Sequence, residues 1–236
     1  MAAQTLGRVL LSQSDLSGAE DPLARYTRLR PRDPVGWNDL AMLRVALRRF
    51  PEAEDNLESA VALGPADADP WSNLGAVRLA RGNPTRAVAA FRQAVELAPT
   101  QARYHADLGA ALLAAGEPTH AVESLQRAVA LRPGEGVLLA TLGYALHVAR
   151  RSDEALAALR RATVLSPRSV TAWNNLAAVL AARGDRPAAR EALGRALALS
   201  PDDPRLLAQR EALAGPEPAS PPAPSAPSRT PPTLPR

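Results

Sequence analysis

The sequence predicts an all-α solenoid, in which pairs of antiparallel helices stack in one direction. Three observations predict it: a period of 34 residues, a proline that closes each period, and apolar residues at helical spacing between the prolines. The closing prolines are Pro31, Pro65, Pro99, Pro133, Pro167 and Pro201. A helix pair of this length cannot bury its apolar face alone, so successive pairs are expected to pack on one another.

Four further columns repeat with the same period and show how the helices of a pair meet. A leucine recurs at Leu6, Leu40, Leu74, Leu108, Leu142 and Leu176, and a glycine or alanine follows each one. An alanine recurs at Ala19, Ala53, Ala87, Ala121, Ala155 and Ala189, and a bulky residue follows four positions later at Leu23, Leu57, Phe91, Leu125, Leu159 and Leu193. Spacing of four keeps the last two columns on one helical face, and a large residue beside a small one lets two helices approach closely. A further alanine completes this stripe in the last five units, whereas Tyr26 occupies its place in the first.

Together these columns resemble the tetratricopeptide repeat (TPR). Its pattern has an aromatic residue, then Leu-Gly after two intervening residues, then alanine, a bulky residue, alanine and a closing proline. Trp37, Trp71 and Trp173 occupy the aromatic position, from which Ala3, His105 and Leu139 depart. The resemblance implies a right-handed superhelix of about 12 helices plus a C-terminal capping helix.

The period divides the chain into consecutive units. The predicted order is a degenerate unit at 1–33, sharper units at 34–67, 68–101, 102–135, 136–169 and 170–203, a capping helix at 204–214, and a disordered proline-rich tail at 215–236. Within three units a glycine, Gly82, Gly116 or Gly184, is expected to end the first helix in a left-handed conformation. Prolines such as Pro51, Pro84 and Pro118 are expected to begin the second helix.

Composition narrows the setting of the protein. No apolar run reaches the ~18 residues of a membrane span, and residues 1–15 lack the features of a secretory signal, so we expect a cytoplasmic protein without membrane insertion. The chain has no cysteine, which excludes disulfides and thiolate metal sites. All 28 basic residues are arginine, which we interpret as the codon bias of a GC-rich bacterial genome.

The net charge of +4 does not indicate a nucleic-acid partner, because the basic residues are scattered and no basic run is interleaved with aromatic residues. Catalytic, metal-binding and cofactor-binding constellations are not predicted either. His105, His120 and His147 are far apart in sequence without carboxylates at ligand spacing, and the glycines follow the repeat pattern instead of forming a phosphate loop. The sequence therefore predicts a protein that is not an enzyme and needs no cofactor.

The resemblance places function on the concave groove that the first helices of TPR units line. The predicted groove residues are polar positions beside the leucine column, together with larger side chains one or two turns further on. They are Asn38, Asp39, Met42, Asn73, Arg103, Asp107, Tyr144, His147, Asn174 and Asn175. Because acidic residues outnumber the single cation Arg103, we expect a neutral or basic partner. The predicted function is an interaction module, a scaffold or adaptor, that holds a peptide segment or helix of another protein. The alternative is a non-catalytic targeting or assembly subunit for an enzyme or envelope machinery encoded elsewhere.

Overall fold

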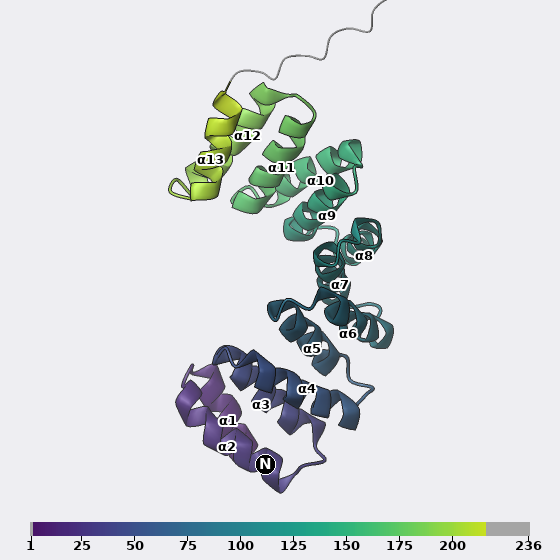
Figure 1. The fold of residues 1–236 in the computed structure, drawn as a ribbon, viewed down its shortest axis with the longest axis vertical. Coiled ribbons are helices and arrows are strands. Elements are labelled where there is room, and N and C mark those ends of the chain that lie inside the picture. The colour runs from purple at the N-terminus through teal and green to yellow at the C-terminus, as the bar shows by residue number, and fades with distance from the viewer. Residues whose placement is uncertain (1, 216–236) are drawn as a thin grey trace, which may run out of the picture.

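The structure, a computed structural model, describes residues 2–215, and these form thirteen helices joined by short turns (Figure 1). The helices are α1 (Ala2–Ser12), α2 (Leu16–Leu29), α3 (Pro34–Ala46), α4 (Phe50–Leu63), α5 (Ala68–Ala80), α6 (Pro84–Leu97), α7 (Ala102–Ala114), α8 (Pro118–Leu131), α9 (Gly136–Val148), α10 (Ser152–Leu165), α11 (Val170–Ala182), α12 (Arg186–Leu199) and α13 (Pro204–Ala214). This architecture confirms the predicted all-α solenoid. The tail prediction for 215–236 lies outside the described residues beyond Gly215.

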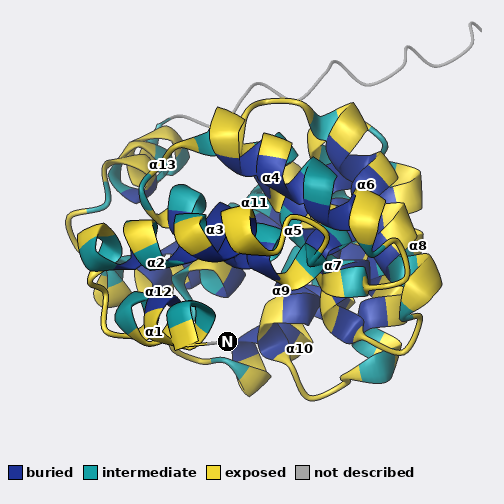
Figure 2. Cartoon of the chain, turned by 90° about the horizontal axis from the view of Figure 1, so that it is seen from below, coloured by how far each residue is buried: buried dark blue, intermediate teal, exposed yellow. Residues whose placement is uncertain are grey.

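Each odd-numbered helix packs most closely on the even-numbered helix that follows it, and the pairs stack in chain order along the long axis (Figure 1). Seen along that axis, α1, α2, α12 and α13 lie on one side of the molecule while α6 and α8 lie on the other (Figure 2). The stack therefore coils. Buried residues lie mainly where the helices pack on one another, and exposed residues lie mainly on the outer surfaces (Figure 2).

The turn inside each pair contains one residue in the left-handed conformation, and these residues are also 34 apart. The predicted glycines Gly82, Gly116 and Gly184 have φ of +75°, +78° and +83°. Ser14, Arg48 and Arg150 adopt the same conformation at the equivalent positions, with φ of +63°, +57° and +63°. A side chain there is strained because the Cβ atom crowds the backbone. The turn geometry is thus set by the repeat even where glycine is missing.

The repeating columns form the core. Leu40, Leu74, Leu108, Leu142 and Leu176 are all buried, as are the alanine column and the bulky residues that follow it. A Cβ atom added at Gly143 would lie 2.4 Å from Leu159 Cγ, which explains why the position after the leucine is small.

Two residues of the first unit differ from expectation. Leu6 is 52% exposed because within residues 2–215 no helix precedes α1, whereas its counterparts are covered by the preceding unit. Tyr26, the misfit of the alanine stripe, is buried, and its hydroxyl donates to Asp33.

Candidate functional site

The odd-numbered helices line the inner side of the coil. Consecutive odd-numbered helices contact one another along the stack, from α1·α3 through α9·α11, and no two consecutive even-numbered helices in residues 2–215 make as extensive a contact. In a curved stack the inner elements are the closer ones. The concave face therefore belongs to α1, α3, α5, α7, α9 and α11.

Polar side chains on this face are hydrogen-bonded from one odd-numbered helix to the next. The bonded residues are 35 apart in sequence: Gln4 Nε2 to Asp39 Oδ2 (3.0 Å), Asn73 Nδ2 to Asn38 Oδ1 (2.9 Å), Ser72 Oγ to Asp107 Oδ2 (3.4 Å) and Asn175 Nδ2 to the Ala140 carbonyl (3.4 Å). We call these residues the polar ladder. Because each bond joins neighbouring units, the polar ladder stabilises the stack as well as lining the groove.

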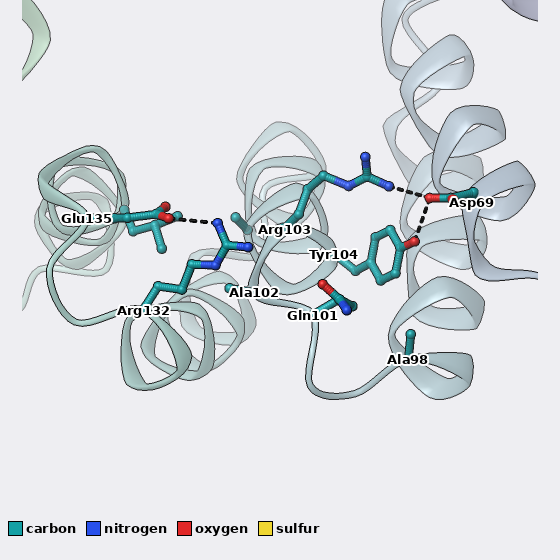
Figure 3. Close-up of a pocket in the computed structure, with 10 residues that line it drawn as sticks. Asp69, Ala98, Gln101, Ala102, Arg103, Tyr104, Arg132 and Glu135 are labelled. Atoms are coloured by element: carbon teal, nitrogen blue, oxygen red, sulfur yellow. Dashed lines mark hydrogen bonds and ion pairs between the residues drawn. The ribbon is translucent and has the colours of Figure 1, made fainter.

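A hollow of about 640 Å³ opens at the start of α7 and α9 (Figure 3). On its α5 side, the Asp69 carboxylate accepts hydrogen bonds from Arg103 Nη2 at 2.6 Å and from the Tyr104 hydroxyl at 2.7 Å. On its α9 side, Arg132 and Glu135 form an ion pair at 2.8 Å. Both arginines of the hollow are thus neutralised within it, so it lacks the free positive charge that an anionic ligand needs.

The pKa values of the carboxylates on this face shift in opposite directions, depending on whether burial or pairing dominates. Burial raises the pKa of Asp39 and of Asp107 above the usual value. The hydrogen bond from Gln4 to Asp39, and the charge of Arg103 with the hydrogen bond from Ser72 at Asp107, only partly offset it. The hydrogen bond from Tyr104, followed by that from Arg103, lowers the pKa of Asp69. Asp107 is the groove carboxylate without an ion pair among residues 2–215, since Arg8 lies 4.0 Å from Asp39.

Helix α9 presents the most apolar stretch of the concave face. Val137, Tyr144 and Val148 are 65%, 46% and 41% exposed, and their spacing of seven and four places them on one side of the helix. The equivalent positions of α7 carry Arg103, Ala110 and Ala114, which are charged or small. His147 belongs to the same stretch and is half-buried. Of the other helices on this face, α3 carries exposed Val35 and Met42.

The ten groove residues predicted from the sequence all lie on odd-numbered helices, from α3 to α11. Asn38, Asp39, Asn73, Asp107 and Asn175 belong to the polar ladder, and Asp39 is buried. Met42, Arg103 and Tyr144 are exposed, whereas His147 and Asn174 are half-buried. Their role in binding stays a prediction.

Sequence reasoning missed Tyr104 and the α9 residues Val137 and Val148. The sequence alone does not indicate Tyr104, because its bond to Asp69, 35 residues earlier, depends on how one unit is offset from the next. A signal for α9 was present, since Val137 and Val148 fall at helical spacing from Tyr144.

Other kinds of site find no support in the part of the chain that the structure describes. No helix there has the length and apolar character needed to cross a bilayer. The same residues contain no group of three or more histidine, aspartate or glutamate side chains placed to hold a metal ion.

The family model described as tetratricopeptide repeat matches residues 38–102, 73–136 and 141–204, which is more than half of the chain. The chain belongs to the tetratricopeptide repeat family. The TPR solenoid described above thus has the family's repeat, with its aromatic, leucine, alanine and proline columns, in successive units.

Solved TPR structures share this fold. The chain is similar to YrrB, described as a TPR protein with an unusual peptide-binding site, at 22% identity and a TM-score of 0.66 over 80% of this chain and 97% of that one. It is similar to pilF of Pseudomonas aeruginosa at 17% identity and a TM-score of 0.74, over 89% and 96% of the two chains. It also resembles a thermophilic TPR protein of Thermus thermophilus, TTC0263, at 21% identity and a TM-score of 0.61, over 77% and 98%. No curated protein sequence matches the chain significantly. At these identities the similarity concerns the fold alone.

Proposed function

We propose that this TPR protein is a non-enzymatic interaction module, a bacterial cytoplasmic scaffold or adaptor that holds a peptide segment or helix of another protein in its concave groove. TPR folds generally serve protein interaction, and the similar YrrB is described with a peptide-binding site. The observation that carries the proposal is the apolar face of α9, because large exposed apolar residues aligned on a concave surface are typical of binding sites.

The groove offers two kinds of contact to a peptide. Tyr144, with Val137 and Val148 on either side, is a rigid aromatic residue of the type that dominates binding energy at interfaces. The polar ladder still has carbonyl and carboxylate oxygens that accept further hydrogen bonds from a peptide backbone. With Arg103 neutralised by Asp69 and Asp107 unpaired, the charge of the groove favours a neutral or basic segment.

A peptide library selected on the wild-type protein tests this proposal. Peptides selected by the groove should bind Tyr144→Ala at least tenfold more weakly, because the variant removes the aromatic anchor without touching a packing column. Val164→Ala is the matched control: Val164 is 79% exposed on α10, an outer helix, and its variant should bind as the wild type does. Far-UV circular dichroism and melting should be the same for all three proteins.

Selected peptides that bind Tyr144→Ala as well as the wild type would contradict a groove centred on α9. Peptides lost from Val164→Ala instead would move the interaction to the outer face.

A further inference from the structure

The side chain at the aromatic position of the repeat forms a hydrogen bond to the closing proline of the preceding unit. The indole Nε1–H groups of Trp37, Trp71 and Trp173 donate to the carbonyls of Pro31, Pro65 and Pro167, at 2.9, 3.1 and 2.9 Å. At the fourth such position His105 Nε2 lies 2.8 Å from the Pro99 carbonyl, so an imidazole performs the same task. In each case the ring nitrogen bonds the carbonyl of the proline six residues earlier, which closes the preceding unit.

Leu139 occupies this position in the unit 136–169 and cannot perform the task. The Pro133 carbonyl instead accepts a long hydrogen bond of 3.4 Å from Arg161 Nη2. Leu139 lines a hollow of about 300 Å³ between α8, α9 and α10, and Pro133 lines another of about 560 Å³ together with Val164 and Leu165. Ala157 and Arg161 line both hollows, so the arginine side chain lies at the boundary between them.

Three residues of the smaller hollow's wall are the counterparts of residues in the apolar cluster on which a tryptophan packs elsewhere in the chain. Trp71 packs against an apolar cluster that includes Val61, Leu74 and Ala90. The residues 68 positions later, two units along, are Val129, Leu142 and Ala158, and all three line the hollow beside Leu139. The unit 136–169 therefore retains part of the apolar surroundings of a repeat tryptophan, with the smaller, buried side chain of Leu139 in place of the indole.

The charged residues around the two hollows indicate which residues would flank an aromatic side chain that a partner inserts there. Arg160 and Arg161 are exposed and form no ion pair with any residue in 2–215. Glu154, at the edge of the smaller hollow, is paired with Arg151 at 2.7 Å. The rim is thus positive, which complements acidic residues.

We propose that this aromatic slot, defined by Val129, Leu139, Leu142, Ala158 and Arg161, binds a tryptophan that a partner protein presents between acidic residues. The partner's indole N–H donates to the Pro133 carbonyl in place of the weak Arg161 bond. The guanidinium of Arg161 then lies over the ring, as that of Arg103 lies 4.8 Å from the Tyr104 ring centre in this chain. The slot is on the outer side of the coil, so it is independent of the groove function proposed above.

Methyl NMR of the full chain tests the slot, because the protein's own tryptophans obscure fluorescence. The probe is the peptide acetyl-Glu-Asp-Trp-Asp-Glu-amide. We expect saturable shifts of the Leu139, Leu142 and Leu146 methyl signals. The same peptide with phenylalanine in place of tryptophan should bind roughly fivefold more weakly, because it lacks the N–H donor.

Two variants and a control locate the site. Leu139→Trp fills the slot with the chain's own indole and should abolish the shifts while raising the melting temperature. Arg161→Glu leaves the fold intact because the side chain is exposed, and it should weaken the acidic peptide about tenfold by reversing the rim charge. Tyr144→Ala, on the inner face, should leave the shifts unchanged.

The proposal is overturned if the wild type shows no methyl shifts, or if a folded Leu139→Trp protein retains them. Equal binding of the tryptophan and phenylalanine peptides would overturn the indole assignment. If Leu139→Trp does not fold, unchanged affinity of Arg161→Glu for the acidic peptide decides against the slot. A slot variant that loses the acidic peptide but keeps the groove-selected peptides, or Tyr144→Ala with the reverse result, shows that the two binding sites are independent.

Discussion

The two halves of this solenoid use the same repeat but fill one equivalent position differently. From α6 to α13 a single apolar cluster runs from Ala87 to Leu206, whereas two smaller clusters lie between α1 and α6. In the second half, one position of the even-numbered helices holds a buried valine, Val88 or Val122. One position of the odd-numbered helices that follow them holds a buried leucine, Leu112 or Leu146. In the first half the equivalent residues are Glu54 and Arg78, joined at 2.9 Å.

Glu54 is the centre of a buried charge cluster. It is only 2% exposed and pairs with Arg78, Arg81 and Arg86, while Glu58 pairs with Arg78 and Arg86. Burial opposes ionisation of Glu54, but the hydrogen bonds from Arg78 and Arg81 outweigh it and lower the pKa of Glu54. The repeat backbone therefore accepts either an apolar pair or an ion pair at this position. Only the apolar pair makes neighbouring cores continuous.

The largest expected effect comes from breaking this cluster on one side. Glu54→Val should lower the free energy of unfolding by about 3 kcal/mol, because it leaves the largely buried guanidinium of Arg78 with Glu58 as its one remaining carboxylate partner among residues 2–215. Glu54→Val with Arg78→Leu recreates the pair of the second half and should restore wild-type stability or exceed it. Urea unfolding of the two proteins measures the difference. A double variant as unstable as the single one would show that the first half cannot accept the apolar pair.

The same cluster should make stability depend on pH. Since the pKa of Glu54 is lowered in the folded state, its contribution is complete above the usual value of 4.5 and is lost as pH falls through the folded pKa. The double variant should lack this part of the acid dependence.

A cavity in the continuous core of the second half should lower the free energy of unfolding by a similar amount, but its structural effect should remain local. Leu108→Ala should lower the free energy of unfolding by about 2–5 kcal/mol, through lost transfer energy and the cavity left behind. Hydrogen exchange should show loosening centred on residues 102–135, because each unit contacts only its neighbours. A uniform loss of protection over all units would be the opposite outcome.

A smaller effect, with the opposite pH dependence, is expected at Asp107. Burial raises its folded pKa, so the ionised carboxylate destabilises the folded state above that pKa and the penalty disappears below the usual value of 3.8. Asp107→Asn should therefore stabilise the protein at neutral pH and not at pH 3. Melting at both pH values checks this, and an equal gain at both would exclude the electrostatic explanation.

The smallest effect concerns the turns. Arg150→Gly should stabilise the protein by about 0.5–1 kcal/mol, because glycine adopts the positive φ of this turn without strain. The matched reverse change, Gly116→Arg, should destabilise it by a similar amount. Denaturation midpoints that move together in the two variants would contradict the backbone explanation.

Much of the fold could be predicted from the sequence, because its causes lie within one repeat. The helices, the buried leucine and alanine columns, and the left-handed turns at Gly82, Gly116 and Gly184 each follow from spacing and residue type. For the candidate groove, the sequence could predict which helix face lines it but not which residues on that face bond to one another. That Asn73 bonds Asn38, or that Asp69 bonds Arg103 and Tyr104, depends on how one unit is offset from the next.

By itself the sequence determined the repeat, its direction of stacking and its helix ends, since hydrogen bonding and side-chain periodicity within a helix are local. Only the tertiary structure decided what occurs between units. It decided that a residue meets the one 35 positions later, that Glu54 is compensated by arginines from α5 and α6, and that Leu139 leaves a hollow under Arg161. The physical reason is that these contacts depend on the curvature of the stack, which results from the packing of all the units together.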